Sequence, residues 1–205
     1  MKLVVFGATG GTGRAVLEQA VRAGHKVTAV VRRADALPPA PGVRVAVIPD
    51  LQDQELVDHA VTGQDAVISA LGTNAKGPVS VCADGTQSIL TAMRAARVRR
   101  LLVVSAYGAA ETHDRSLYSL ALWVTLGHKM RDKEVMEELI RRSDLDWTVV
   151  RPPKLTGRPH TGRYRTGTDL RIRLTSAISR ADLADFLVRE AAASEFLRQF
   201  PRITG

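Results

Sequence analysis

The chain has 205 residues, of which 45% are apolar and 24% charged, and this composition excludes a disordered chain and a small disulfide scaffold in favour of one globular domain, residues 1–205. Its single cysteine, Cys82, has no disulfide partner within the chain, so we expect a cytoplasmic protein. The net charge of +8 suits nucleic-acid binding, but an aromatic content of 4% and the lack of a recognised binding motif argue against it.

Apolar runs of four to six residues alternate with segments of helical period, which is the pattern of β-α-β units. The expected strands cover residues 2–6, 27–31, 43–48, 66–69, 101–104 and 147–150. The helical segments centre on residues 16–21, 56–61, 89–93 and 136–140, and a turn-rich link covers 36–42. We therefore predict an α/β fold, a Rossmann-like doubly wound parallel sheet of about six or seven strands.

The motif Gly7-Ala8-Thr9-Gly10-Gly11-Thr12-Gly13 follows the first strand directly and precedes the first helix. Gly7 lets the chain turn sharply, Gly10 lets the backbone approach a pyrophosphate, and Gly13 lets helix and sheet pack closely. The helix N-terminus adds free N–H groups and a partial positive charge. The spacing is GxxGxxG rather than GxGxxG, yet its position favours nucleotide binding over a merely structural turn.

Charged residues follow the second and third strands. Arg32 and Arg33 stand where a carboxylate would bind the ribose 2′-hydroxyl of NAD, so they favour the 2′-phosphate of NADP. The alternative is that both arginines are solvated, and Asp35 nearby weakens the inference. Asp50 follows the third strand and suits either an adenine contact or simple turn formation.

The fourth and fifth strands end in small and hydroxyl-bearing residues. The segment from Ala70 to Gly72 leaves room in the crevice that a cofactor must pass. Ser105 lies at the tip of the fifth strand, where ligands of such sheets bind, and would contact a substrate or the nicotinamide region, or else only cap the next turn. Tyr107 is interpreted as a packing residue at least as readily as a site residue.

The segment that follows is helical. Its apolar stretch from about Leu117 to Leu126 is roughly half of the ~20 residues that a membrane span needs, so we expect no membrane segment. We interpret that stretch as core, with pocket and partner contact as alternatives. Lys129 and Lys133 lie one turn apart on one face. Lys133 would hold the nicotinamide ribose or pair with Glu137 on the surface.

A loop-rich cap is expected at residues 151–175, where prolines and glycines interrupt any long element. Its basic residues oppose the single acid Asp169 and are either a solvated surface or an electrostatic funnel for an anionic ligand. We expect a short strand at 170–174, a last helix capped by Ser179, and an edge strand near Ile203. The basic residues are Arg151, Lys154, Arg158, Arg163, Arg165, Arg171 and Arg173.

Together the glycine motif, Val30-Val31-Arg32-Arg33, Ser69-Ala70-Leu71-Gly72 and Ser143-Asp-Leu-Asp-Trp-Thr-Val-Val-Arg-Pro-Pro resemble an atypical short-chain dehydrogenase/reductase of the NAD(P)H-binding, NmrA-like group. The chain is most similar to the biliverdin reductase B or NADPH-dependent flavin reductase family. The resemblance implies NADP(H), in preference to NAD(H), and hydride transfer to a flavin, quinone or tetrapyrrole, with any flavin as substrate rather than prosthetic group.

The resemblance also implies a set of site residues. Ser105 and Lys133 are the predicted catalytic residues, and no metal is expected. The predicted cofactor-binding residues are Gly7, Thr9, Gly10, Gly11, Thr12, Gly13, Arg32, Arg33, Asp50, Leu51, Ala70, Leu71, Gly72, Lys133, Pro152 and Lys154.

Two positions depart from the family pattern. Lys129 stands where typical short-chain dehydrogenases carry the tyrosine of a Tyr-x-x-x-Lys pair, and Lys154 stands where the family carries a histidine. The missing tyrosine favours acceptors that take a proton from solvent. We therefore predict an NADPH-dependent reductase of a small anionic acceptor, acting as monomer or dimer, and keep as alternative a non-catalytic NADP(H)-sensing regulatory protein of the NmrA-like type.

Overall fold

The computed structural model describes residues 1–113 and 117–205, without the side chains of residues 117–122. Its central sheet has six strands in the order β3-β2-β1-β4-β5-β6, and all neighbouring pairs are parallel. The predicted doubly wound α/β fold is confirmed. The strands are β1 (Lys2–Phe6), β2 (Lys26–Val31), β3 (Val43–Val47), β4 (Ala66–Ser69), β5 (Arg100–Val104) and β6 (Asp146–Val150).

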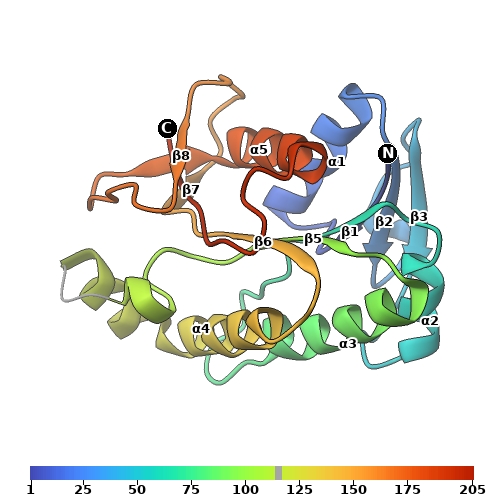
Figure 1. The fold of residues 1–205 in the computed structure, drawn as a ribbon, viewed down its shortest axis with the longest axis horizontal. Coiled ribbons are helices and arrows are strands. Elements are labelled where there is room, and N and C mark those ends of the chain that lie inside the picture. The colour runs from blue at the N-terminus through green and yellow to red at the C-terminus, as the bar shows by residue number, and fades with distance from the viewer. Residues whose placement is uncertain (114–116) are drawn as a thin grey trace.

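Helices cover both faces of this sheet (Figure 1). One face carries α1 (Gly11–Arg22) and α5 (Arg180–Ala193), which pack against each other. The other face carries α2 (Gln54–Val61), α3 (Val81–Ala96) and α4 (Leu117–Arg141). The link between β2 and β3 holds only a short 3-10 turn, η1 (Ala34–Ala36), and a second such turn, η2 (Ala110–Thr112), precedes α4.

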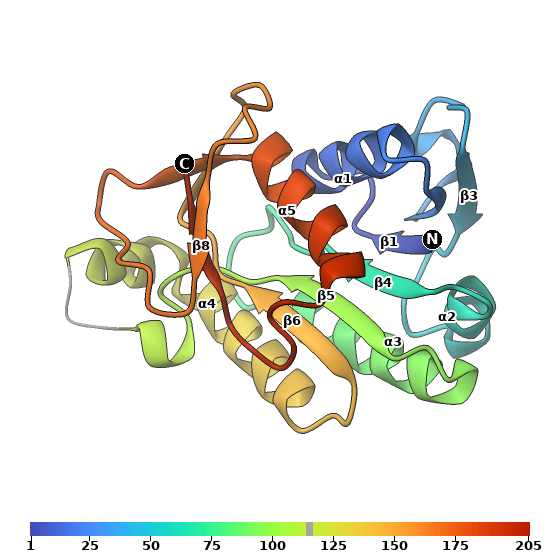
Figure 2. The ribbon, with the colours of Figure 1, turned by 45° about the horizontal axis from the view of Figure 1, so that its top comes forward.

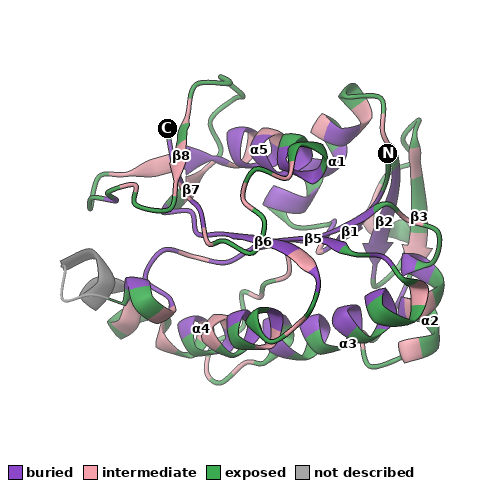
Figure 3. Ribbon diagram, in the orientation of Figure 1, coloured by how far each residue is buried: buried purple, intermediate pink, exposed green. Residues whose placement is uncertain are grey.

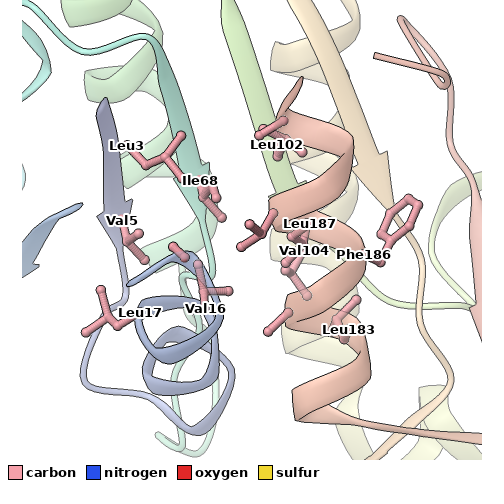
Figure 4. Packing of buried hydrophobic residues seen from close by; sticks show 14 of the residues in the cluster. Leu3, Val5, Val16, Leu17, Ile68, Leu102, Val104, Leu183, Phe186 and Leu187 are labelled. Atoms are coloured by element: carbon pink, nitrogen blue, oxygen red, sulfur yellow. The ribbon is translucent and has the colours of Figure 1, made fainter. Parts of the chain in front are cut away.

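Alternate side chains of each inner strand enter two separate cores, because successive residues of a strand point to opposite faces. Leu3 and Val5 pack toward α1 and α5, while Val4 and Phe6 pack toward α2, α3 and α4. Figure 4 shows the first of these cores between the sheet, α1 and α5. This double burial explains why the strands were recognisable as continuous apolar runs. The edge strand β3 is the exception, since it is largely exposed (Figure 3).

The cap holds four short strands beyond β6, so it extends past the expected residues 151–175 to include 177–179 and 202–204; Figure 2 labels one of the four, β8 (Arg165–Gly167). The expected strand at 170–174 is wrong: Ile172 is buried there, but Leu174 is 63% exposed and the segment pairs with no described strand. The predicted start of the last helix at Ser179 is confirmed, since the Ser179 hydroxyl accepts from the Asp182 N–H. The predicted strand near Ile203 is also present, as β10. The strands are β7 (Lys154–Thr156), β8 (Arg165–Gly167), β9 (Ala177–Ser179) and β10 (Arg202–Thr204), paired as β7 with β9 and β8 with β10.

Helix α4 is broken at Leu126, whose backbone leaves the helical region at φ −128° and ψ 18°. The interpretation of residues 117–126 as core fails for its described end, because Val124 is 79% and Leu126 39% exposed. The side chains of 117–122 lie outside the described residues. Within the described part of the chain, no helix is long and apolar enough to cross a membrane.

Candidate active site

The predicted site residues gather along one edge of the central sheet. Because all six strands are parallel, their carboxyl ends lie at that edge, where ligands of open α/β sheets bind. The order in which strands are added to the sheet reverses between β1 and β4: β2 and β3 extend it on one side, and β4, β5 and β6 extend it on the other. This gap between β1 and β4 is the topological switch point. In spatial order, the edge carries residues 50–51 after β3, 32–33 after β2, 7–13 after β1, 70–72 after β4, Ser105 after β5 and 152–154 after β6.

The glycine motif forms the tight connection from β1 into α1. Gly7 has φ +73°, and a Cβ there would lie 2.5 Å from the Ala70 carbonyl oxygen. A Cβ on Gly13 would overlap the Gly7 carbonyl oxygen and lie 2.8 Å from Ala8 Cα. Gly10 is the N-cap of α1, and no side chain caps it. The motif therefore leaves the first N–H groups of a long helix facing the edge, as a phosphate site requires.

Two arginines that the sequence did not single out flank this motif. Arg180, the first residue of α5, lies over Gly11, because a Cβ on Gly11 would come within 2.9 Å of the Arg180 Cδ and Nε. No described carboxylate pairs with Arg180. Arg14 donates from Nε to the Thr9 carbonyl oxygen at 3.0 Å and so braces the motif. Arg180 was missed because it is remote from Gly11 in sequence, and only the packing of α5 on α1 joins them.

Arg32 and Arg33 are both exposed beyond β2, but they differ in their partners. Arg33 pairs with Asp35 at 3.5 Å, and both side chains are 80% exposed. Arg32 has no described ion-pair partner. The weakening influence of Asp35 therefore falls on Arg33, and Arg32 is the free guanidinium at the end of β2.

Residues after β3 and β4 form the rest of this half of the edge. The Asp50 carboxylate accepts from the Gln52 N–H at 2.9 Å, so it does form the turn that the sequence offered as an alternative. Leu51 and Leu71 are half-buried and pack against the core. At Gly72 a Cβ would meet no atom within 4 Å. This open position beside the switch point is where a bound molecule has room to pass.

Replacing Gly72 with alanine tests that interpretation. Since the added methyl group meets no protein atom, the free energy of unfolding should rise by about 0.4–1 kcal/mol through the lower entropy of the unfolded chain. The Kd for NADPH should nevertheless rise about tenfold, because the methyl group would occupy space that the cofactor needs. Urea unfolding and calorimetric titration measure the two effects; an unchanged Kd would place the cofactor elsewhere.

A buried ionic network holds the ends of β5 and β6. Ser105 is 3% exposed, and its hydroxyl donates to Glu137 Oε1 at 2.5 Å. Arg151 donates from Nε and Nη2 to the two oxygens of the same carboxylate, at 3.1 and 2.6 Å. The Arg151 guanidinium also contacts Glu111 at 2.9 Å and lies 4.2 Å from the centre of the Phe200 ring. This network fixes the Ser105 hydroxyl with its proton directed at Glu137.

The network corrects two interpretations of the sequence. Arg151 is not part of the basic surface, because its side chain is 2% exposed and paired with Glu137, itself 1% exposed. Glu137 does not pair with Lys133; the Lys133 ammonium instead donates to the Val104 carbonyl oxygen at 3.1 Å. Partial burial alone would raise the pKa of Glu111, but hydrogen bonds from Arg151 and from the backbone, together with the attraction of the Arg151 and Arg141 charges, outweigh it and hold that pKa at about 2.

Ser105 and Lys133 therefore both lie where the carboxyl end of β5 meets α4, since Ser105 donates to Glu137 of α4 and Lys133 of α4 donates to the Val104 carbonyl oxygen. This brings the two predicted catalytic residues together. Pro152 is buried after β6, and its carbonyl oxygen accepts from the Tyr107 N–H at 2.9 Å. Tyr107 is buried and lies under the Arg202 guanidinium, as its packing interpretation indicated. Lys154 opens β7 and is exposed, with its ammonium available at the start of the cap.

The N-terminus of α3 is capped from another helix. Asp132 of α4 is 5% exposed, and its carboxylate accepts from the N–H groups of Cys82 and Ala83 at 3.0 and 2.9 Å. This contact ties α3 to the turn of α4 that carries Lys133. Burial raises the pKa of the Cys82 thiol to about 11, so this cysteine is an inert packing residue.

A family model described as NAD(P)H-binding matches residues 7–194. The chain belongs to this NAD(P)H-binding family. The match begins at the first glycine of the motif and ends just after α5, so it includes every strand of the central sheet except β1, the site edge and most of the cap. It confirms the resemblance to an NAD(P)H-binding group that the sequence indicated.

Several relatives are described as reductases or oxidoreductases. A 3-diazoavenalumate denitrifying reductase from a Streptomyces species is 34% identical over 192 residues, which cover 84% of this chain and 62% of that protein. The solved structure of ChuY, an anaerobilin reductase from Escherichia coli O157:H7, is 25% identical, with a TM-score of 0.83 over 99% of this chain and 96% of ChuY. The oxidoreductase YlbE from Lactococcus lactis shares the fold, with 20% identity and a TM-score of 0.87 over 100% and 91% of the two chains.

Proposed function

We propose that this protein is an NADPH-dependent reductase that transfers hydride to a planar, anionic acceptor such as a flavin, a quinone or a tetrapyrrole. The observation that carries the proposal is the continuous edge from Arg32 through the glycine motif and Gly72 to Ser105 and Lys133. The reductase relatives support the same reaction class. Oxidation of NADPH in the presence of these acceptors tests the proposal.

The residues present fit a nicotinamide cofactor. The uncapped N-terminus of α1 and Arg180 provide positive potential for a pyrophosphate, and the open space at Gly72 leaves a path along the edge. Beyond it, Lys133 would bind the ribose next to the nicotinamide, and the Ser105 oxygen would accept from its carboxamide. When bound, the reduced cofactor supplies the hydride. The protein's own groups mainly orient the reactants and exclude water.

Arg32 should determine the preference for NADPH. With glutamine at position 32, the guanidinium that would pair with the 2′-phosphate is lost, so the Kd for NADPH should rise about tenfold to a hundredfold while that for NADH changes little. Arg33→Gln is the matched control, because Arg33 already pairs with Asp35 on the exposed surface. Calorimetric titration of both cofactors measures the effect. Equal losses for NADPH and NADH would show that Arg32 does not contact the 2′-phosphate.

Arg180 should contribute to binding of the pyrophosphate, which NADPH and NADH share. The Arg180→Gln variant removes a charge that lies over Gly11, so we expect affinities for NADPH and NADH to fall together, each by about tenfold. Competition with a fluorescent nucleotide analogue measures both. A loss confined to NADPH would assign Arg180 to the 2′-phosphate, and no loss for either would remove it from the site. Arg22→Gln, on the exposed end of α1, controls for the change in net charge.

The side chains near Ser105 and Lys133 favour an acceptor that does not need a proton from a side chain of the protein. Lys129 replaces the tyrosine that would donate a proton, and the Ser105 proton is held by Glu137. A flavin or quinone accepts hydride at a ring atom and can take its proton from solvent. Ketone reduction lacks a donor of this kind at the described site.

The lack of a proton-donating tyrosine at position 129 also favours a second candidate function, a sensor that binds NADP(H) without turnover. The two candidates differ in one observable. A reductase oxidises NADPH when an acceptor is added, whereas a sensor binds NADPH tightly and leaves it unchanged with every acceptor.

A further inference from the structure

The cap encloses a hollow of about 710 Å³ that the sequence did not reveal. It is lined by the two loops on either side of β8, residues 157–164 and 168–176, which are largely exposed (Figure 3), and by residues of β9 and the last two residues of the chain. A volume of this size lies within the range of small-molecule sites, about 300–1,000 Å³. Five arginines line it: Arg158, Arg163, Arg165, Arg171 and Arg173.

None of these five guanidiniums has a described ion-pair partner. The one carboxylate side chain in the lining, that of Asp182, is 4% exposed and already accepts from the Thr161 and Gly162 N–H groups and from the Ser179 hydroxyl. Asp182 therefore links the loop that contains Thr161 and Gly162 to α5, and it forms no ion pair with the five arginines. The remaining lining is rich in threonine and serine, such as Thr175 and Ser176. The hollow is therefore strongly positive and hydrogen-bonding.

Five like charges around one hollow repel one another, and a bound anion would remove that repulsion. Guanidinium groups present forked donors that match carboxylate and phosphate oxygens, and several of them around one space suit several anionic groups at once. A single chloride or monoanion would leave most of this charge uncompensated. The chemistry of the lining selects a ligand with two or more negative charges, carried by carboxylates or by a phosphate.

Residues that line the hollow are neighbours in sequence of residues at the candidate active site. The lining of the hollow begins at Thr156 in β7, two residues after Lys154, and includes Ser179 at the end of β9, directly before Arg180. β7 begins four residues after the carboxyl end of β6, and β9 pairs with β7 and ends directly before Arg180, which lies over Gly11. An acceptor that reaches the edge thus has the hollow next to it.

We propose that this hollow is the binding site for the anionic groups of the acceptor, which must carry at least two negative charges as carboxylates or as phosphate. This inference rests on the proposed reductase function and adds where and by what chemistry the acceptor is selected. The ring of the acceptor does not belong in the hollow, because its lining is polar and charged. The arginines set affinity for the acceptor and leave the cofactor site untouched.

The test compares ligands that differ only in charge. Biliverdin carries two carboxylates that its dimethyl ester lacks, and flavin mononucleotide carries a phosphate that riboflavin lacks. Binding is measured by calorimetry without NADPH for the wild type and for the double variant Arg163→Gln/Arg171→Gln. One substitution lies in the loop before β8 and the other in the loop after it. The control is Arg22→Gln/Arg142→Gln, which removes the same charge from two exposed surface pairs.

We expect the charged member of at least one pair to bind the wild type about tenfold more tightly than its neutral partner, with the difference lost in the hollow variant and kept in the control. The pair that shows the difference distinguishes a carboxylate from a phosphate ligand. A difference that is absent in the wild type, or that persists in the hollow variant, would overturn the anion site. Charge-dependent binding without NADPH oxidation would leave the site standing and refute only the reductase.

Discussion

Replacing Glu137 with glutamine is expected to lower the free energy of unfolding by about 3–5 kcal/mol, because it leaves the buried Arg151 charge without its main partner. The Arg151 guanidinium makes two of its hydrogen bonds to Glu137, at 3.1 and 2.6 Å, and both side chains are almost fully buried. The Ser105 hydroxyl would lose a charged acceptor as well. Urea unfolding followed by circular dichroism measures the change.

The next residue supplies the control. Glu138 pairs with Arg142 on the surface, where both side chains are at least half exposed, so Glu138→Gln should cost no more than about 1 kcal/mol. If Glu137→Gln fails to fold, the double variant Glu137→Leu/Arg151→Met should restore folding, since removing both buried charges costs less than removing one. Equal small losses for Glu137→Gln and Glu138→Gln would show that the ion pair is not what holds the strand ends.

Replacing Gly13 with alanine should abolish tight cofactor binding, raising the Kd for NADPH at least about a hundredfold. The new Cβ would overlap the Gly7 carbonyl oxygen and lie 2.8 Å from Ala8 Cα. These are backbone atoms, so the turn must open or the start of α1 must move. Overpacking of this kind also costs about 1–3 kcal/mol of stability.

Gly157→Ala is the control for this substitution, because a Cβ at Gly157 meets no atom within 4 Å and its backbone is not left-handed. Calorimetric titration with NADPH should give a wild-type Kd for Gly157→Ala. A Gly13→Ala protein that binds NADPH as the wild type does would mean that the cofactor does not lie on the glycine motif.

The central sheet was predictable because its strands, apart from the exposed edge strand β3, are buried on both faces and appear as apolar runs. The site edge followed from topology, since parallel strands place all their carboxyl ends together. The expected strand at 170–174 failed for a related reason: Leu170, Ile172 and Leu174 alternate with arginines as a half-buried strand would, but a strand also needs a partner, and sequence alone does not show one.

The remaining errors concern contacts between distant segments. Arg151 was placed on the surface because a charged residue at the start of a basic, loop-rich segment is usually solvated. Its burial depends on Glu137 arriving from α4. Arg180 was not singled out, because its position over Gly11 depends on the packing of α5 against α1. The hollow likewise arises from two loops that fold toward each other.

The measurement that tests this account most directly is the steady-state oxidation of NADPH, followed by its absorbance, with flavin mononucleotide, a soluble quinone and biliverdin as acceptors and NADH as the alternative donor. We predict turnover with at least one acceptor and a kcat/KM for NADPH at least about tenfold above that for NADH. Tight binding of NADPH without turnover on any acceptor would contradict the reductase and favour the sensor.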